Sequence, residues 1–594
     1  MKIKISGISI CLVVAVCLIM DMNFQKWKQQ EGVIENDIHM YYGYLPALFI
    51  YQDIKLEKSN YLVDGNYYFW TVKTPDGKSV IKMTMGLAYL YAPFFFTAHG
   101  YAKLFNYPAT GFSEPYKISL LLGTLVYLLI GLLVVRKILA HYKFSDLQIS
   151  ISLLLTGLGT NIVCYSTLGA PMPHVFNFCL FALFLYFSIK WHEKQSIKNT
   201  ILLGLIYGII TLIRPSNAVL IIVFIFFDAN SFKSIKDKIV LICKKPFLPV
   251  LFCFLILLVW LPQLLYWKEV TGSYFIYSYP NEAFFFNHPH IIDGLFSFRK
   301  GWLTYTPIMS FALLGFLFMN DELKQIRFSL LLFLIPNLYI IFSWWCWWYG
   351  GTMGQRALID SYALMAVPLA SFIKFLSKSS VVYRILFFCM ALFFVWLNVF
   401  QTFQLFNDSL HYDAMTSELY FKQFGKLTKI TDFYKYLNPP NYYEAAKGND
   451  CDDNSHMKII NDNNHIELLA SNANFLSAEK SDGSVITANQ PFAGKKEIFI
   501  ISFLPDRRVS FQAFDRHFLC AELRRQNEIT YTRDNTGSWE SFELVKLDNN
   551  SIALKAANGN YLSIDEKSMQ LFARAKSIGK NETFILIHTN VSFP

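Results

Sequence analysis

Long apolar runs separated by basic connections occupy the first two thirds of the chain. A membrane span needs about 20 mainly apolar residues, and Lys and Arg mark the ends that stay in the cytoplasm. The runs lie at 5–22, 117–138, 147–168, 175–190, twice within 199–228, and at 246–266, 307–320, 328–344, 363–378 and 381–401. The pattern predicts a polytopic α-helical membrane protein with about eleven transmembrane helices over residues 1–401.

The side of the membrane on which each connection lies follows from the positive charges. Two lysines precede the first run and no clear cleavage site follows it, so we expect a retained anchor with a cytoplasmic N-terminus. The basic end of the 117–138 run, at Arg136 and Lys137, should also be cytoplasmic. Residues 22–116 then form a long outer loop, in which the apolar piece 83–98 lies along the membrane.

The apolar stretch 199–228 is long for one helix and is interrupted at Arg214 and Pro215. The lysines on both sides of it, at Lys198 and from Lys233 onward, are predicted to be cytoplasmic. The chain must therefore cross and return, with Arg214 at the outer turn. Arg214 then either lines a polar cavity or extends its side chain to the outer headgroups, and the sequence leaves both readings open.

The last part of the chain has a different composition and a repeat. Residues 402–464 are rich in Asn, Asp, Tyr and Pro and are expected to be a connector with little internal structure. After it, Ile466-x-Leu468-x-Ala470 recurs as Val509-x-Phe511-x-Ala513 and as Ile552-x-Leu554-x-Ala556, each 43 residues further on. Alternating apolar positions with turn residues between them indicate strands and hairpins. We expect an all-β C-terminal domain over 465–594, a β-trefoil whose closure leaves no free sheet edge.

The third repeat, Ile552-Ala-Leu-Lys-Ala-Ala-Asn-Gly-Asn-Tyr-Leu562, resembles the repeats of the fascin-like β-trefoils. The first repeat has Ala473 in place of the turn glycine, and the second has Asp515 and Arg516 at its turn. The Gln-x-Trp signature of ricin-type sugar-binding trefoils is absent. Actin bundling does not suit a domain tethered outside a membrane, so a glycan or protein ligand and a spacer role remain open.

Composition excludes several classes of protein. Hydrophobic residues make up 54% of the chain and charged residues 16%, which is too few charges for a protein that is soluble throughout. The net charge of +10 comes mostly from Lys and Arg between the apolar runs, so it reflects topology, and nucleic acid is not an expected partner. The ten Cys are scattered and form neither a disulfide framework nor a zinc motif.

Polar and aromatic residues concentrate in four predicted outer segments. They are Glu35–Ala47, Gly159–His174, residues 267–306 and Trp344–Asp360. Their order, with Asp37 close after the first span and an apolar piece along the membrane, resembles the GT-C superfamily of membrane glycosyltransferases. Members such as protein O-mannosyltransferases and the aminoarabinose transferase of lipid A use polyprenyl-phosphate sugars. The resemblance covers about residues 1–400 and implies a GT-C-like fold with a site at the outer face.

The chemistry of such a transfer suits these residues. The leaving phosphate is already a stable anion, so it needs cations more than a proton, whereas the acceptor hydroxyl must lose a proton to a base. Asp37 is the candidate base. Candidates for binding the donor phosphate or sugar are Arg214, Arg299, Lys300, Arg356, His174, Tyr41, Tyr42, Trp348 and Tyr349. A Trp-rich run at 344–348 is most simply an aromatic belt at the membrane interface, and stacking on sugar is the other reading.

The sequence thus predicts a glycosyltransferase of a bacterial inner membrane, with the trefoil in the periplasm. Its partners would be membrane lipid, a polyprenyl-phosphate-linked sugar and an exported acceptor that is lipid, glycan or protein. No metal or other cofactor is expected, because no Asp-x-Asp or clustered carboxylates occur in the outer segments. The alternatives are an O-antigen ligase or polymerase that uses lipid-diphosphate glycans, and a non-enzymatic transporter with a binding domain.

Overall fold

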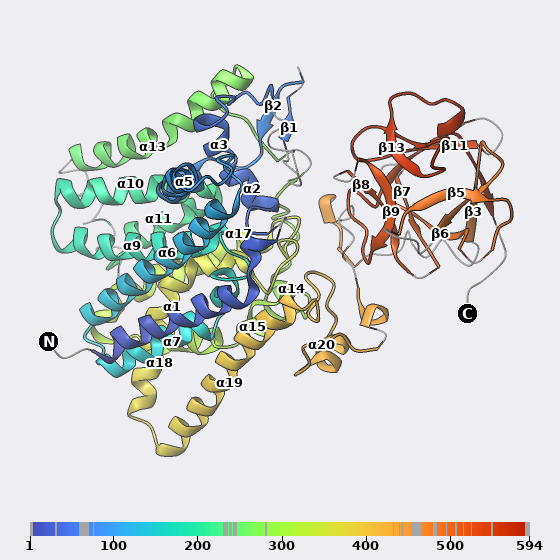
Figure 1. The fold of residues 1–594 in the computed structure, drawn as a ribbon. Helices are drawn as coiled ribbons and strands as arrows, with labels where there is room; N and C mark the ends of the chain where they lie inside the picture. The colour runs from blue at the N-terminus through green and yellow to red at the C-terminus, as the bar shows by residue number, and fades with distance from the viewer. Residues whose placement is uncertain are drawn as a thin grey trace. The chain divides into compact units, whose positions relative to one another are not determined.

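The computed structural model describes the chain from residue 4 to residue 588, with gaps. The gaps are at 30–31, 59–70, 75–76, 230–235, 237–239, 241–245, 280–281, 432, 439, 441–444, 453–464, 479–483, 495, 505–507, 515, 524–525 and 548–550. Asp515 and most of the lysines between 233 and 245 therefore lie outside the described residues. The chain forms two compact units, Met1–Asp452 and Asp453–Pro594 (Figure 1).

The first unit is helical. Seven of its described helices are long and apolar enough to cross a membrane. They are α1 (Ile5–Phe24), α6 (Glu114–His141), α9 (Pro173–Glu193), α13 (Phe247–Thr271), α17 (Lys324–Phe342), α18 (Tyr362–Ser377) and α19 (Val381–Phe406). Shorter apolar helices fill the remaining predicted spans: α7 (Asp146–Leu158), α10 (Ile197–Ile213), η2 (Pro215–Leu220) with α11 (Ile221–Ile225), and α16 (Met309–Gly315) with η3 (Phe316–Phe318). The protein is a multi-pass membrane protein, and eleven crossings remain a prediction.

Short elements connect these helices. They are η1 (Lys26–Lys28), α2 (Asn36–Tyr42), α3 (Tyr44–Phe49), α8 (Ile162–Tyr165), α14 (Ile291–Phe296), α15 (Trp302–Tyr305), η4 (Asp321–Leu323), η5 (Arg356–Ser361), α20 (Ser417–Gln423) and η6 (Phe433–Tyr436). A two-stranded sheet, β1 (Thr71–Lys73) and β2 (Ser79–Ile81), lies in the long loop after α1.

The connections that were predicted to be cytoplasmic contact one another. Ser6 donates a 2.5 Å hydrogen bond to Asp146, and Arg136 donates to Ser6 at 2.8 Å. Lys143 lies 2.5 Å from Glu322. The first two contacts join the start of α1 to the start of α7 and the end of α6. The third joins the turn between α6 and α7 to the turn before α17.

The predicted outer connections also contact one another. Lys26 lies 2.6 Å from Glu35 and donates to the carbonyl of Leu168 at 3.1 Å. Lys117, at the start of α6, donates to the carbonyl of Gln29 at 2.7 Å. The two sets of connections thus lie at opposite ends of the helices, which is the arrangement that the charge pattern requires.

Helix α5 (Gly86–Leu104) occupies the apolar piece of the first outer loop. Figure 1 views it nearly along its axis, whereas α10 and α13 run across the view. Its first residue fits against α10 only because it lacks a side chain, since a Cβ on Gly86 would lie 2.6 Å from the backbone nitrogen of Ile213. The helix therefore crosses the direction of the spans, as expected for a segment that lies along a membrane.

The predicted connector differs from the expectation in one respect. The first unit extends to Asp452, so most of residues 402–464 belong to it and include α20 and η6. Trp347 and Trp348 are buried in a cluster with Cys346, Ala445 and Cys451. These two tryptophans thus pack against connector residues. They are not exposed, as residues of an aromatic belt at the membrane interface would be.

The second unit is an antiparallel β structure of twelve strands. They are β3 (His465–Ala470), β4 (Phe475–Ala478), β5 (Ile486–Gln490), β6 (Ile498–Phe503), β7 (Arg508–Gln512), β8 (Phe518–Glu522), β9 (Glu528–Arg533), β10 (Phe542–Lys546), β11 (Ser551–Lys555), β12 (Tyr561–Ile564), β13 (Leu571–Ala575) and β14 (Phe584–His588). A short η8 (Lys580–Glu582) precedes the last strand.

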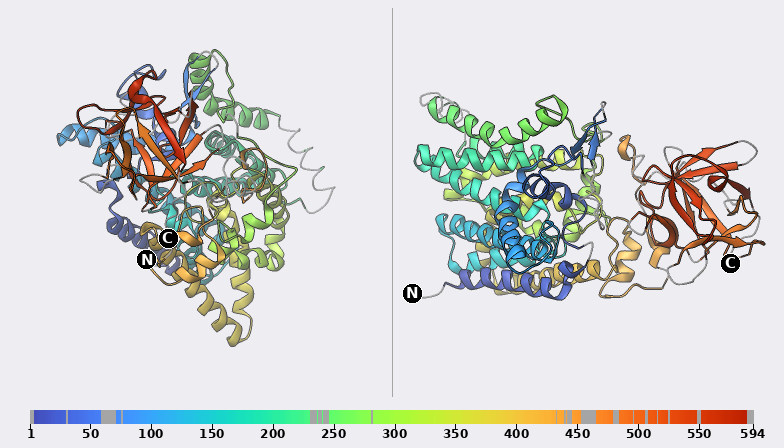
Figure 2. Two further views of the ribbon diagram at one scale, coloured as in Figure 1. Left: turned by 90° about the vertical axis from the view of Figure 1, so that its right-hand side faces the viewer. Right: turned by 45° about the horizontal axis from the view of Figure 1, so that its top comes forward.

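Six of these strands form a closed ring. Pairing runs from β3 to β6, β7, β10, β11 and β14, and β14 pairs with β3 again. The other six form three hairpins, β4–β5, β8–β9 and β12–β13. Two views of this ring are shown in Figure 2. This is the β-trefoil that the repeat predicts, and the repeated apolar positions, among them Leu468, Phe511 and Leu554, form its core.

Each repeat also closes with a buried glutamate. Glu497 accepts a hydrogen bond from the backbone of Gly494 at 2.8 Å and one from Ser477 at 2.6 Å. Glu582 accepts from Gly579 and Ser563 at the same two distances. In the second repeat Glu540 accepts from Gly537 at 2.7 Å, and Cys520 stands at the position of the serine.

Candidate functional site

An ion pair joins the first outer segment to the last. Asp37 lies in the first turn of α2, and Arg356 begins η5. A guanidinium nitrogen of Arg356 donates to Oδ2 of Asp37 at 3.1 Å. The two side chains are 25% and 15% exposed, so both can also contact a bound molecule. The candidate base and one candidate phosphate ligand therefore meet.

A second ion pair joins Arg214 to Asp360. Arg214 follows the last residue of α10 and precedes Pro215, which interrupts the helix. Its guanidinium lies 3.7 Å from Oδ2 of Asp360 and 5.5 Å from the centre of the Tyr349 ring. The Arg214 side chain is 17% exposed. Arg214 therefore contacts polar and aromatic groups at the break between two short helices, and both of its predicted readings stay predictions.

Asp360 is the centre of a buried polar network. His174 donates from Nδ1 to Oδ1 of Asp360 at 3.1 Å. Asn177 and Asn217 donate to Oδ2 at 2.8 and 2.9 Å. The carboxylate is 2% exposed, so these donors replace the water that it would otherwise bind. In the sequence, Asp360 is recognisable only as the end of an outer segment, and neither asparagine stands out from its apolar surroundings.

Tyr41 lies within electrostatic range of both ion pairs. Burial raises the pKa of its hydroxyl, the positive charges of Arg214 and Arg356 oppose that rise, and Asp37 and Asp360 add to it. Burial likewise raises the pKa of Tyr349 to about 12, with Arg214 again opposing. Both phenols are therefore neutral hydrogen-bond donors at physiological pH.

Lys300 is buried close to this group. Its side chain is 1% exposed, and its ammonium donates to the carbonyl of Thr352. Burial lowers the pKa of Lys300 to about 7; the negative charge of Asp413 opposes this change and the positive charge of Arg356 adds to it. Lys300 is therefore a cation whose charge changes near neutral pH.

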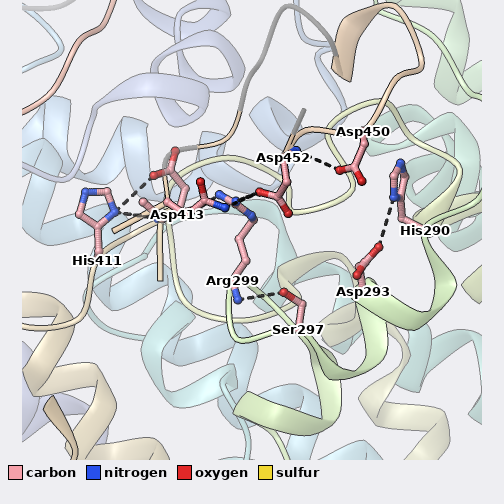
Figure 3. A network of polar contacts seen from close by, with 10 residues as sticks. His290, Asp293, Ser297, Arg299, His411, Asp413, Asp450 and Asp452 are labelled. Carbon is pink, nitrogen blue, oxygen red and sulfur yellow. Dashed lines mark hydrogen bonds and ion pairs between the residues drawn. The ribbon is translucent and has the colours of Figure 1, made fainter. Parts of the chain in front are cut away.

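Arg299 contacts residues of the connector (Figure 3). It donates to the carbonyl of Asp413 at 2.6 Å and to Oδ1 of Asp452 at 2.5 Å. Its guanidinium also lies 5.9 Å from the ring of Trp348. The same view shows His411 beside Asp413, 3.3 Å apart. Arg299 and Trp348 thus hold connector residues, and the structure does not bring them to Asp37.

Tyr42 is also held by the protein. Its side chain is fully buried, and its hydroxyl donates to the carbonyl of Gly111 at 2.5 Å. Its ring packs against Phe95 and Phe112. Tyr42 therefore joins α2 to the end of the outer loop.

One group of described residues has the spacing of metal ligands. The ligand atoms of Asp450, Cys451 and Asp452 all lie within 4.8 Å of one another. However, Oδ1 of Asp452 already accepts hydrogen bonds from Arg299 and Asn438. This group lies on the connector, whereas Asp37 and Asp360 are each bound by protein cations or amides. The expectation of no metal stays a prediction.

These contacts bring part of the predicted set together. Arg356 pairs with Asp37. Arg214 and His174 contact Asp360, and Arg214 also lies 5.5 Å from the centre of the Tyr349 ring. Tyr41 lies within electrostatic range of both pairs. The arrangement offers a partly exposed carboxylate beside one arginine, with a second arginine at Asp360 and two neutral phenols. Such a site can accept a proton from a hydroxyl and bind an anion.

Comparisons with known proteins give matches to both units. The family described as the FRG1-like domain matches residues 528–592, and no curated protein matches the chain. The archaeal oligosaccharyltransferase AglB from Archaeoglobus fulgidus, in complex with an inhibitory peptide and a dolichol-phosphate, is similar over 68% of this chain and 56% of its own length, with 13% identity and a TM-score of 0.40.

Two β-trefoil proteins are similar over a smaller part. The designed threefold-symmetric protein ThreeFoil matches 21% of this chain and 98% of its own, with 19% identity and a TM-score of 0.20. The BEL β-trefoil matches 21% and 92%, with 11% identity and a TM-score of 0.19. The chain thus has an archaeal oligosaccharyltransferase among its structural neighbours and carries an FRG1-like segment at residues 528–592.

Proposed function

We propose that the first unit is a GT-C-type glycosyltransferase that transfers a sugar from a polyprenyl-phosphate donor to an exported acceptor. The observation that carries the proposal is the Asp37–Arg356 pair, in which a partly exposed carboxylate and a partly exposed guanidinium lie 3.1 Å apart at one end of the helices. A base for the acceptor and a cation for the leaving group are thereby side by side.

The cations act on the leaving group. During transfer the bond between the sugar C1 and the phosphate oxygen breaks, and the phosphate leaves with the electron pair. Arg356 and Arg214 have N–H groups that can bind phosphate oxygens, and Tyr41 is a neutral donor within electrostatic range of both. Negative charge that builds up on the phosphate is therefore met by positive charge already in place.

Asp37 acts on the acceptor. A new bond forms between the acceptor oxygen and the sugar C1, and the hydroxyl proton passes to the carboxylate of Asp37. One carboxylate is enough because the phosphate needs no proton, whereas a glycosidase needs two carboxylates on either side of the bond. His174 is held by Asp360 and offers a second ring nitrogen, Nε2, that has no hydrogen-bond partner among the described residues. Because Nδ1 carries the proton, Nε2 is an acceptor, and we assign it to a hydroxyl of the sugar.

The proposal has a cellular part. We place the site on the periplasmic face of a bacterial inner membrane, with no metal, and the trefoil in the periplasm, where it would bind or position the acceptor. The opposite ends of the helices carry the two sets of connections that this topology requires, which supports the placement.

The test is transfer of a radiolabelled sugar from polyprenyl phosphate by the purified full-length protein. Asp37→Asn should lower kcat by about 10²- to 10⁴-fold. Glu35→Gln is the matched control, because Glu35 also lies at the start of α2 and also pairs with a cation, Lys26, at 2.6 Å. It should retain nearly full activity. Equal activity of Asp37→Asn and the wild type would refute the assignment of the base, and lipid movement without sugar transfer would favour a transporter.

A further inference from the structure

A basic pocket lies on the connector, apart from the proposed site. It has a volume of about 530 Å³ and is lined by Lys422, Lys426 and Lys429 together with Thr428, Thr431 and Tyr436. The positive-inside rule does not account for three lysines at this end of the helices. The Lys and Arg residues that keep connections in the cytoplasm lie at the opposite end. Lys422 lies 3.6 Å from Glu418, and this pair is exposed and therefore weak.

The backbone beneath the lysines is held by buried amides. Gln404 of α19 donates to the carbonyls of Gln423 and Lys426 at 3.0 and 2.8 Å. Gln423 donates to the carbonyl of Thr428 at 2.7 Å. Both glutamines are at most 4% exposed. The carbonyls thus point inward to the amides, while the lysine side chains are exposed. The backbone that carries the lysines is therefore held in one position.

Apolar side chains of the same segment are exposed beside the lysines. Phe421, Phe424 and Leu427 are 67%, 40% and 41% exposed. The Phe424 ring lies 5.9 Å from that of Trp396 and 6.4 Å from that of Phe393, both on α19. Trp396 and Phe393 are each 43% exposed, on a helix that is long and apolar enough to span the membrane. The exposed aromatic surface of the segment thus continues the lipid-facing surface of the helix.

We propose that residues 417–431, together with Tyr436, form a membrane-interface site that binds the phosphate of an anionic phospholipid. Phe421, Phe424 and Leu427 enter the boundary between acyl chains and headgroups, as aromatic and aliphatic side chains of interfacial segments do. The three lysines then lie at the level of the phosphates and bind them as point charges. A lipid headgroup fits better than a soluble phosphate, because the pocket adjoins a lipid-facing helix and its lining contains no arginine for two-pronged binding.

The test is native mass spectrometry of the full-length protein, released from detergent micelles that contain phosphatidylglycerol and phosphatidylcholine in equal amounts. The wild type should retain phosphatidylglycerol in preference. The triple variant K422Q/K426Q/K429Q should lose that preference by at least tenfold, since each lysine near an anionic surface contributes a factor of about 5. The control K546Q/K567Q/K576Q removes three exposed charges from the trefoil and should retain the preference.

Two further measurements distinguish lipid binding from a structural role of the lysines and from binding of a soluble anion. The variant K422R/K426R/K429R keeps the three positive charges and should keep the preference for phosphatidylglycerol. If this variant loses the preference, the lysines act by stabilising the fold and the proposal is contradicted. Inorganic diphosphate is added to the wild type in lipid-free detergent and followed by calorimetry. Binding below about 1 mM that disappears in K422Q/K426Q/K429Q would assign the pocket to a soluble anion and overturn the lipid site. An unchanged lipid preference in K422Q/K426Q/K429Q would overturn it as well.

Discussion

Asn217 donates a 2.9 Å hydrogen bond to Asp360, although 143 positions separate the two residues in the chain. The bond ties the break after α10 to the segment that enters α18. Backbone that is not helical survives at membrane depth only where it is enclosed by protein or lines a cavity. The buried carboxylate of Asp360 is therefore what allows the interrupted helix and holds Arg214 at its end.

Removal of that carboxylate should destabilise the first unit. In Asp360→Ala the side chains of His174, Asn177 and Asn217 lose their acceptor in a buried environment. We expect a loss of about 3 to 5 kcal/mol in the free energy of unfolding, measured by thermal or denaturant unfolding in detergent. Asp293→Ala, at an exposed acid, is the control and should change stability by less than about 0.5 kcal/mol. Equal effects would show that Asp360 is not the organising group.

Lys300 should make stability depend on pH above neutrality. Its pKa is lowered from the usual 10.5 to about 7, so between these values the unfolded chain binds a proton that the folded chain lacks. Unfolding then takes up a proton, and stability rises with pH by up to about 1.4 kcal/mol per pH unit. The unfolding free energy from pH 7 to 9 should rise more steeply in the wild type than in Lys300→Met. Identical slopes would mean that the buried lysine does not titrate there.

Arg299 should control how firmly the connector is attached. Arg299→Gln removes charge-assisted bonds to Asp413 and Asp452, each worth about 1.5 to 3 kcal/mol when buried. Trypsin should cleave the lysines of the connector at least tenfold faster, because local opening becomes more frequent. Asp452→Asn should have a smaller effect, since its side chain is 49% exposed. No change in cleavage would contradict this role.

The trefoil contains a position at which one repeat is weaker than the others. Cys520 takes the place of Ser477 and Ser563, whose hydroxyls donate to glutamates at 2.6 Å. A thiol is a poor donor, and burial raises both its pKa and that of Glu540. Cys520→Ser should therefore stabilise the domain by about 0.5 to 1.5 kcal/mol, seen as slower hydrogen exchange in β8 and β9. Ser563→Ala should have the opposite effect in β12 and β13.

Much of the fold could be predicted from the sequence because short, repeated patterns of apolar and polar residues specify its elements. The repeat at Ile466, Val509 and Ile552 gave three equal units, and threefold repetition has few solutions in three dimensions. The apolar runs and their basic ends likewise placed the connections in two groups that the structure finds at opposite ends of the helices. The connector was harder, because polar composition does not reveal that Ala445 and Cys451 cover two tryptophans.

The candidate site could be predicted only as separate residues. Asp37 and Arg356 were each recognisable as charges in outer segments, but their contact spans 319 positions, and nothing local specifies it. Asn177 and Asn217 were missed because an amide within an apolar stretch looks like a tolerated polar residue. A signal was present in the combination of a buried-looking Asp360 with several amides nearby in apolar segments, since a carboxylate among apolar residues needs such donors.

The ring of the trefoil has its first and last strands side by side, since β14 pairs with β3 over five residues from Phe584 to His588. The polypeptide thus enters and leaves this unit at neighbouring points, and one short tether suffices to attach it. Such a unit can be transplanted onto another chain, or exchanged for a trefoil of different ligand preference, without opening the ring. The trefoil is in this sense an exchangeable module, and recombination could replace it while the helical unit stays unchanged.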